Sequence, residues 1–455
     1  MILKIKNIIK NNFILHEVYK KLHNLKTKKI ENDTVKRLND IEKLSNKEIE
    51  DLQKNMLLNI LEYSYKNTNY YKKLFDENNI NYMDIEDLKR IPFLDKSIIK
   101  VNKSDIISKE FDISELGLKN TGGSTGEPLV FYCNTKAGLI DLGHHAYLYK
   151  LMGHKKNDII LSCGGFNIPD NLIKSNIFWL KMESGDLFGD YKFSVLYLNN
   201  SNIKLYVDKL LEIKPNILRG YPSFFYTLGK YILENNINLN FQIKGINLTS
   251  EMCSLEQRIL IEKAFSSMVY FEYGHTEVSL YCYTNDNTYS YKSSPIYGYI
   301  EVLDDQGNET KVGKVGNIIT TGFNNVGMPF IRYKTGDLGE VAYRNGGVIH
   351  FKSIFGRTQD YILTKNNDKV YLTALIFGQH LKAFSNIYKW QIIQNQTGVI
   401  DINIIKGNEY SISDEVEIRE KITEVTDIEI NFMYVNNIPK TKRGKHLFLI
   451  QRIKN

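Results

Sequence analysis

Between residues 203 and 272 the chain alternates between two hydrophobic patterns, and this alternation limits the possible folds more than any other feature. Ile203, Val207 and Leu210 are spaced as on one face of a helix that ends before Pro215. Further helical patterns are separated by short apolar runs that are typical of buried strands, at 217–218, 245–249 and 268–272. Alternating helices and strands predict an α/β fold.

Two polar segments of this region stand directly after strands. Arg219-Gly-Tyr-Pro-Ser223 follows the first strand, and Tyr273-Gly-His-Thr-Glu277 follows the third. Between the second and third strands, Ser254 and Gln257 form a capping box, so a helix should begin there. Open α/β sheets bind ligands past the carboxyl ends of their strands, which makes the segment 273–277 a candidate site.

The regions on either side of this α/β part differ from it. Residues 1–102 are rich in Lys, Glu, Leu, Ile and Tyr, and their apolar residues have helical spacing. Near the C-terminus we expect helices at 372–384 and 414–426 and strands at 394–406, 428–435 and 446–451. The chain should therefore have a large domain over 1–356, mainly helical over 1–102, and a small α+β domain over 357–455.

Composition excludes several classes of protein. The chain has 455 residues, a net charge of +7 and 42% hydrophobic residues, as in globular proteins. Basic and acidic residues are interleaved, so we expect no nucleic-acid partner. No stretch approaches the roughly 18 apolar residues of a membrane span, and Met1–Leu15 lacks the apolar run of a signal peptide. The four cysteines stand far apart and form no CxxC pair: Cys133, Cys163, Cys253 and Cys282. This spacing argues against a zinc site and against a disulfide framework, so we expect the reducing environment of the cytoplasm.

The glycine-rich segment Thr121–Pro128 is a candidate phosphate loop. Its three glycines allow the backbone to approach a ligand, while its hydroxyl and N–H groups can surround phosphate oxygens. No Gly-Lys-Ser/Thr closes the segment, so it is not a Walker A motif. A glycine-rich hairpin turn is the structural alternative.

The same segment contains Gly122-x-Ser124-x-Gly126, the pattern of a hydrolase nucleophile elbow. An elbow needs an apolar strand before the serine and a helix after it. Here the serine follows Lys119-Asn-Thr121 and precedes the strand-like run Leu129–Tyr132. This context favours a loop between strands, but an esterase using Ser124 stays as the alternative enzyme class.

Two further polar segments offer nucleotide contacts. In Tyr273–Glu277, the aromatic ring of Tyr273 could stack on a base, Thr276 could donate to a phosphate and Glu277 could hold Mg²⁺. Asp337, after the turn at Gly336, could accept hydrogen bonds from a ribose diol. Each could instead be an ordinary structural turn.

In this order, the segments resemble the adenylate-forming superfamily of acyl-CoA synthetases and ligases. The nearest resemblance within it is to the phenylacetate–CoA ligase family, particularly members associated with capsular polysaccharide biosynthesis. The matching motifs span residues 121–445: Thr121–Pro128, Arg219–Ser223, Thr249–Met252, Tyr273–Glu277, Phe330–Asp337, Gly356–Ile362, Leu372–His380 and Pro439–Lys445. The helical N-terminal region with Ile91–Lys96 is also similar.

The resemblance implies a fold of the acyl-CoA synthetase type with a mobile C-terminal lid, and a role for each matching residue. The loop that would hold the β- and γ-phosphates of ATP comprises Thr121, Gly122, Gly123, Ser124, Thr125 and Gly126. Ser250 and Glu251 would border the adenine with Tyr273 against it, and Gly274 and His275 would also belong to the nucleotide site. The ribose would be bound by Asp337 and Arg357, and the lid would turn on a hinge at Gln359 and Asp360.

The catalytic groups implied in the same way are Lys445 from the lid, Thr276 at the α-phosphate and Glu277 as the Mg²⁺ ligand. The acyl pocket would lie near Tyr221, Ser223 and Phe224. The implied reaction is attack of a carboxylate on the α-phosphorus of ATP, which releases pyrophosphate, followed by transfer of the acyl group to CoA. An amino sugar or another amine is the alternative acceptor.

Two positions depart from the family pattern. Glu127 replaces the usual lysine of the phosphate loop, and Gln359 stands where Asp or Lys often serves as the hinge. These two positions bear on how fast ATP is positioned and on whether the lid rotation serves CoA. A nucleotide-binding pseudoenzyme therefore stays as an alternative beside the hydrolase.

Overall fold

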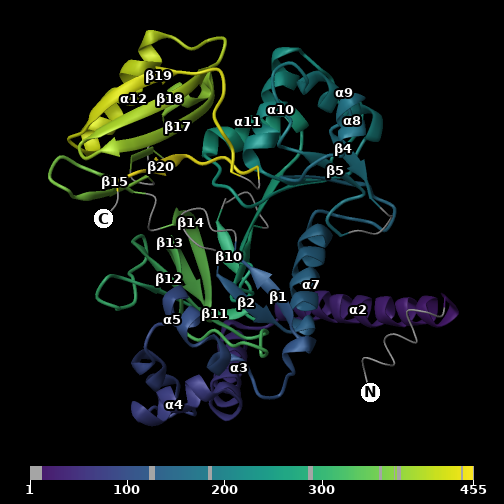
Figure 1. Cartoon of the computed structure of the whole chain (residues 1–455), viewed down its shortest axis with the longest axis vertical. Helices are drawn as coiled ribbons and strands as arrows, with labels where there is room; N and C mark the ends of the chain where they lie inside the picture. The colour runs from purple at the N-terminus through teal and green to yellow at the C-terminus, as the bar shows by residue number, and fades with distance from the viewer. Residues whose placement is uncertain are drawn as a thin grey trace.

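A twelve-stranded sheet forms the body of the molecule, with its strands in the order β11-β12-β13-β14-β10-β9-β8-β7-β6-β3-β5-β4. The computed structural model describes residues 13–121, 129–182, 187–284, 290–357, 361–372, 375–376, 381–441 and 444–453. Figure 1 shows three parts: the N-terminal helices, the large sheet with its helices, and the C-terminal strands with α12 above them.

One half of the sheet is parallel and wound with helices. Its neighbouring parallel strands are β5, β3, β6, β7 and β8. The strands are β3 (Ile160–Gly164), β5 (Tyr191–Ser194), β6 (Ile217–Gly220), β7 (Gly245–Leu248) and β8 (Val269–Gly274). They are connected through α9 (Ile203–Ile213), α10 (Pro222–Glu234) and α11 (Leu255–Phe265). The α/β alternation predicted for this region is therefore confirmed, and so is the Ser254–Gln257 capping box at the start of α11.

The other half of the sheet is antiparallel. Strands β11 to β14 pair in sequence, β10 lies between β14 and β9, and β8 pairs antiparallel with β9 at the junction. The strands are β9 (Tyr281–Tyr283), β10 (Tyr291–Ser293), β11 (Gly298–Leu303), β12 (Val315–Gly322), β13 (Tyr333–Asn345) and β14 (Val348–Arg357), while β4 (Trp179–Lys181) adds the opposite edge. A separate hairpin consists of β1 (Gly117–Asn120) and β2 (Val130–Cys133).

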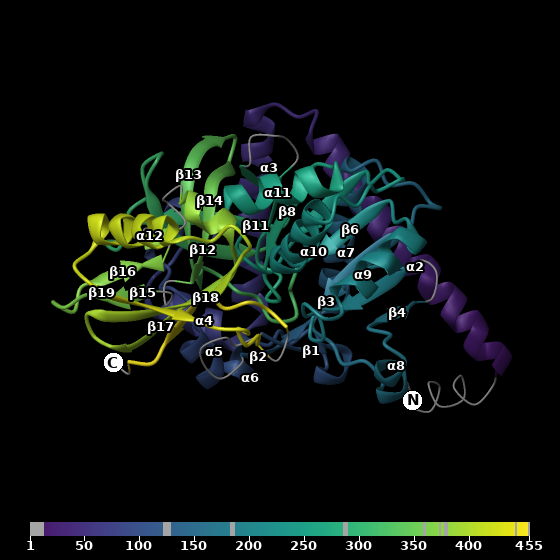
Figure 2. The ribbon, with the colours of Figure 1, turned by 90° about the horizontal axis from the view of Figure 1, so that it is seen from above.

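The N-terminal region is helical, as predicted. Its helices are α2 (Phe13–Ile41), α3 (Asn46–Asn67), α4 (Asn69–Glu77), α5 (Lys96–Val101) and α6 (Lys103–Ile106). The long helix α2 extends beyond the body of the molecule in Figures 1 and 2 and packs along α7 (Thr135–Leu151). At their crossing a Cβ on Gly143 would lie 2.5 Å from Thr34 Cβ, so only glycine permits this approach.

Arg332 joins the N-terminal helices to the antiparallel strands. Its guanidinium donates to both carboxylate oxygens of Glu301, at 2.9 and 3.0 Å, and to the carbonyls of Lys89 and Ile91. The side chain is buried, so this ion pair is held by a full set of hydrogen bonds. Among the described residues, no helix combines the length and apolar character that a bilayer-spanning segment needs.

The C-terminal part has its own core. Its four-stranded sheet has the order β19-β18-β17-β20, and the buried residues of α12 pack on it, among them Ile418 and Ile422. The elements are β17 (Ile387–Gln396), β18 (Val399–Lys406), α12 (Ile412–Val425), β19 (Glu429–Tyr434) and β20 (Leu449–Gln451), with a small hairpin of β15 (Tyr361–Leu363) and β16 (Lys369–Tyr371). The α/β fold class predicted for the whole chain is confirmed.

One local prediction in this part is wrong, and two others agree with the structure only over part of their length. The expected single strand over 394–406 is a hairpin, because Gly398, with φ of +76°, reverses the chain between β17 and β18. Of the helix expected over 372–384, residues 372 and 375–376 are helical and its end is the 3₁₀ helix η4 (Lys382–Asn386), while 373–374 and 377–380 lie outside the described residues. The strand expected at 446–451 is shorter and covers 449–451.

Candidate active site

Three of the predicted nucleotide-binding residues lie in direct contact at the carboxyl end of β8. The Tyr273 hydroxyl donates to Asp337 Oδ2 over 2.7 Å, and His275 Nε2 lies 3.0 Å from the same oxygen and 2.8 Å from the Tyr273 hydroxyl. Tyr273 and Gly274 are the last residues of β8, whereas Asp337 comes from β13. The structure therefore brings together residues 62 to 64 positions apart.

The imidazole of His275 is electrostatically tied to this cluster. Burial alone would lower the pKa of His275, but the hydrogen bond and charge of Asp337, together with the charge of Glu277, raise it above the usual value. Its Nδ1 is buried and has no hydrogen-bond partner among the described residues. In a protonated His275, the Nδ1–H group would thus be a buried donor that is available to a ligand near Asp337.

Asp337 also lies opposite Arg357, the second residue predicted at the ribose. The two are direct partners in the antiparallel register of β13 and β14. The two residues predicted to bind the ribose therefore stand at the same register position on neighbouring strands.

Glu277 and Thr276 follow the cluster but differ in burial. Glu277 is buried, and its Oε1 accepts a 2.9 Å hydrogen bond from the hydroxyl of the buried Tyr333. Thr276 is exposed, as is Gly274. Among the described residues, no group of three or more His, Cys, Asp or Glu could hold a metal ion. Mg²⁺ bound with substrate phosphates needs only one or two protein carboxylates, so a single Glu277 is compatible with that ion.

The candidate phosphate loop connects the two strands of the β1–β2 hairpin. Thr121 is buried at its base, where its hydroxyl accepts a 3.0 Å hydrogen bond from the Leu129 N–H. Residues 122–128, with Gly122, Gly123, Ser124, Thr125 and Gly126, lie outside the described residues. Because β1 and β2 pair antiparallel, the segment that contains Ser124 is followed by a strand. Among the described residues, the first element after Ser124 is thus the strand β2, whereas a hydrolase elbow requires a helix there.

The second predicted adenine segment, Ser250–Glu251, follows β7. Ser250 has φ of +71°, a left-handed conformation that costs a non-glycine residue free energy and often marks functional sites. The Glu251 carboxylate accepts hydrogen bonds from two backbone N–H groups, 3.1 Å from Ser223 and 2.7 Å from His446. Burial raises the pKa of Glu251, while these hydrogen bonds and the charge of Lys445 oppose the rise.

The residues predicted for the acyl pocket begin α10. Tyr221 caps the helix, and its N–H lies 3.2 Å from the sulfur of Cys163. Ser223 lines a cavity between the domains. Phe224 is buried in an aromatic core between Phe193 and Tyr206. The roles of all three in acid binding stay predictions.

The basic loop 439–445 contacts the large domain through Lys440 and Gly444, two of its described residues. A Cβ on Gly444 would lie 2.3 Å from Val195 Cγ2 and 3.0 Å from the Cα of Gly165, so this contact is close. Lys440 Nζ donates to the Val195 carbonyl. Burial and the charge of Lys389 lower the pKa of Lys440 to about 8. Residues 165 and 195 follow β3 and β5, so the loop sits where the carboxyl ends of the parallel strands meet.

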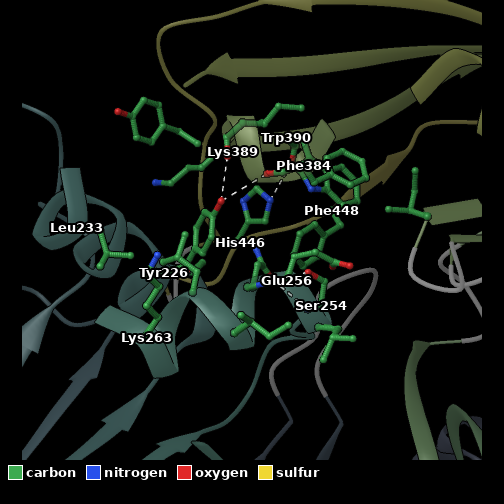
Figure 3. Close-up of a pocket in the computed structure, with 18 residues that line it drawn as sticks. Tyr226, Leu233, Ser254, Glu256, Lys263, Phe384, Lys389, Trp390, His446 and Phe448 are labelled. Carbon is green, nitrogen blue, oxygen red and sulfur yellow. Dashed lines mark hydrogen bonds between the residues drawn. The ribbon is translucent and has the colours of Figure 1, made fainter. Parts of the chain in front are cut away.

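A cavity of about 390 Å³ lies beside this loop, between α10 and α11 on one side and the C-terminal sheet on the other. Figure 3 shows Tyr226 and Ser254 facing Trp390, His446 and Phe448 across it. The Tyr226 hydroxyl donates to the Ile387 carbonyl at 3.3 Å. The walls are mainly apolar, so this cavity differs from the polar cluster around Asp337.

Sequence analysis missed a buried charge network between α7 and the parallel strands. Glu272 accepts from Arg219 at 2.5 Å, from His145 at 2.9 Å and from Asn247 at 3.0 Å, and His145 lies 3.7 Å from Asp141. The sequence did contain a signal for this network, because a charged residue ends each apolar run. Arg219 follows Ile217–Leu218, and Glu272 follows Phe271. The i, i+4 spacing of Asp141 and His145 was another.

The region predicted to hinge, Gln359 and Asp360, lies outside the described residues. Cys282 is fully buried, and its thiol is not part of a disulfide.

Comparison with known proteins supports the relationship seen in the motifs. Residues 362–452 match the family model of the CapK C-terminal domain. The chain is 27% identical over 437 residues to Protein CapK of Staphylococcus aureus, covering 93% of this chain and 92% of that one. It is 22% identical over 397 residues to phenylacetate–coenzyme A ligase of Thermus thermophilus, covering 80% and 82%.

The fold is similar to that of 2-hydroxyisobutyryl-CoA ligase. The crystal structure of that enzyme in the postadenylation state, in complex with 2-HIB-AMP, gives a TM-score of 0.69 at 18% identity over 88% of this chain and 89% of that chain. The same enzyme in the thioesterification state, with 2-HIB-AMP and CoA, gives 0.56 at 18% identity over 89% and 90%. The predicted resemblance to adenylate-forming enzymes and to the phenylacetate–CoA ligase family is confirmed.

Proposed function

We propose that this chain, a relative of CapK and of phenylacetate–CoA ligase, activates a carboxylic acid with ATP and transfers the acyl group to CoA. The observation that carries the proposal is the position of the C-terminal loop. His446, next to the predicted catalytic Lys445, is hydrogen-bonded to Glu251 in the predicted adenine segment. The C-terminal domain therefore contacts the large domain next to the candidate nucleotide-binding residues.

In the proposed first step a carboxylate oxygen attacks the α-phosphorus of ATP, and pyrophosphate leaves with the electron pair of the broken P–O bond. Both reactants are anions, so alignment and charge neutralisation dominate the barrier. The Lys445 ammonium would neutralise the carboxylate and the α-phosphate, with Thr276 beside the α-phosphate. Asp337, held by Tyr273, would orient the ribose.

Glu277 is the residue that would hold Mg²⁺ with the phosphates of ATP. The bound ion would offset negative charge on the departing pyrophosphate. Tyr333 fixes one carboxylate oxygen of Glu277, which supports a defined orientation for the other.

In the second step the acceptor attacks the acyl carbonyl, and AMP leaves. CoA is the proposed acceptor because the relatives named above include CoA ligases. The similarity to CapK suggests a role in surface polysaccharide biosynthesis, in which an amino sugar or another amine would replace CoA. The use of ATP and CoA fits the cytoplasm.

Acid-dependent exchange of labelled pyrophosphate into ATP, measured over a panel of aryl, aliphatic and amino acids, tests the proposal. We expect exchange with one class of acid, and loss of on the order of 10²–10³ in its rate in Lys445→Ala with folding unchanged. ATP-independent ester cleavage that Ser124→Ala abolishes would support the hydrolase instead. Nucleotide binding without exchange on any acid would indicate a pseudoenzyme.

A further inference from the structure

The Glu251 carboxylate connects three separate parts of the candidate site. It belongs to the segment after β7, its Oε2 accepts from the Ser223 N–H at 3.1 Å, and its Oε1 accepts from the His446 N–H at 2.7 Å. Hydrogen bonds to an ionised group are roughly twice as strong as neutral ones. A single side chain thus holds both the start of α10 and the C-terminal loop.

On the large domain, the N–H group that donates to Glu251 is that of Ser223, which has no acceptor within α10 itself. Pro222 is the first residue of α10 and has no N–H, so the Ser223 N–H is the first donor of the helix. The positive end of the helix dipole also favours a carboxylate there. The contact with the Ser223 N–H therefore holds Glu251 at the start of α10 within the large domain.

The donor on the C-terminal domain is fixed to its own sheet. The His446 ring Nε2 lies 2.8 Å from the Trp390 carbonyl, and the ring meets Phe448 edge-on at 4.5 Å. Burial and the charges of Lys389 and Lys440 lower the pKa of His446 to about 4, so the ring is neutral and Nε2 donates to that carbonyl. Figure 3 shows His446 between α11 and this part of the C-terminal domain.

The backbone of Lys445 is consequently held on both sides. Its own N–H donates to Thr441 Oγ1 at 3.0 Å, and the next N–H in the chain, that of His446, donates to Glu251. A displacement of the His446 N–H would move the Lys445 Cα by a similar amount, since the two residues are adjacent. Misplacement by about 1 Å can cost a catalytic group on the order of 10² in rate.

We infer that Glu251 is a positioning residue that places Lys445 for adenylation by holding the His446 N–H, rather than only a border of the adenine pocket. The inference rests on the proposed function. The chain offers a matched control in Glu234, which also accepts across the domain interface, from the Tyr388 hydroxyl at 2.8 and 3.0 Å, but belongs to the far end of α10.

The test is a double-mutant cycle on the full chain, with acid-dependent pyrophosphate exchange as the readout. Glu251→Ala should lower kcat about 10- to 100-fold, as expected for loss of a charge-assisted hydrogen bond, with KM for ATP within about twofold. Glu251→Gln, which keeps one acceptor oxygen, should lose less. Glu234→Ala should stay within about twofold of wild type. In the Lys445→Ala background, Glu251→Ala should lower kcat by less than a further factor of about two. Glu251 acts only through Lys445, so its loss has little effect once the lysine is gone.

Three results would overturn the inference: full additivity with Lys445→Ala, a raised KM for ATP at unchanged kcat, or an equal loss in Glu234→Ala. Amide hydrogen exchange gives a readout that needs no activity. Peptides containing Ser223 and His446 should lose protection in Glu251→Ala and keep it in Glu234→Ala. Unchanged protection would refute the contact itself. Absence of exchange by the wild type on every acid would instead contradict the proposed function.

Discussion

At the residue scale, the buried network of Glu272 has a definite electrostatic character. Burial would lower the pKa of His145, but the charges and hydrogen bonds of Glu272 and Asp141 raise it to about 9. Burial would raise the pKa of Glu272, but Arg219 and His145 lower it well below its usual range. Two carboxylates therefore balance an imidazolium and a guanidinium inside the fold, where unpaired charges would be costly.

This network predicts a pH dependence of stability. The pKa of His145 is higher in the folded protein than the usual 6.5, so protonated His145 favours folding. The contribution is complete below about pH 6.5, is lost as the pH rises through about 9, and amounts to on the order of 3 kcal/mol. The free energy of unfolding should therefore differ more between wild type and His145→Gln at pH 6 than at pH 9.5, by urea denaturation. A difference independent of pH would contradict the charged pair.

Residue chemistry could be predicted where the residues stand in a motif. Tyr273, His275 and Asp337 were proposed from local patterns and family resemblance, and the structure places them in contact. Their proposed roles at the nucleotide stay predictions. The contact of Glu251 with His446 could not be derived, because it joins residues 195 positions apart through a backbone N–H, which carries no signal in the side-chain sequence.

At the scale of elements, the turn from β6 into α10 depends on Gly220. Its φ is +144°, and a Cβ there would lie 2.2 Å from Cys163 Sγ and 2.8 Å from the Cys163 carbonyl oxygen. Because one of these atoms is backbone, β3 would have to move to make room. This close packing of β6 on β3 fixes the start of α10.

Gly220→Ala should accordingly destabilise the protein by roughly 2–5 kcal/mol, from overpacking and backbone strain together. Gly153→Ala is the matched control, since Gly153 also has positive φ, +78°, but nothing lies within 4 Å of the added Cβ. We expect the control to cost about 1 kcal/mol. Equal losses of unfolding free energy in the two variants would show that packing at Cys163 is unimportant.

Elements were predictable where the hydrophobic period was clear. The helix predicted from Ile203, Val207 and Leu210 is present as α9, with those positions buried. The β17–β18 hairpin was read as one strand because a two-residue alternation continues on both sides of Gly398. Only that glycine signalled the reversal, and long-range pairing of β17 with β20 has no local signature.

At the scale of the whole molecule, the docked position of the C-terminal domain depends on Gly444. Its φ is +74°, and an added Cβ would meet Val195 and Gly165. Gly444→Ala should weaken docking and lower the adenylation rate at least about tenfold, while each domain keeps its own core. Exchange kinetics and the radius of gyration by X-ray scattering would measure both effects.

The control for docking is Gly313→Ala. Gly313 has a similar φ of +77°, with nothing within 4 Å of an added Cβ, so the variant carries the same backbone strain without the contact. It should retain the wild-type adenylation rate and radius of gyration. A loss equal to that of Gly444→Ala would assign the effect to general destabilisation.

The central claim, that the acid is activated as an acyl-adenylate, is tested most directly by the fate of the carboxylate oxygen. The acid that supports exchange would be labelled with ¹⁸O in both carboxylate oxygens and turned over with ATP, using hydroxylamine as a surrogate acceptor. Because a carboxylate oxygen becomes the bridge to the α-phosphorus, mass spectrometry should find one ¹⁸O in AMP and none in pyrophosphate. Label in orthophosphate with ADP as the other product, or AMP without label, would contradict adenylate formation.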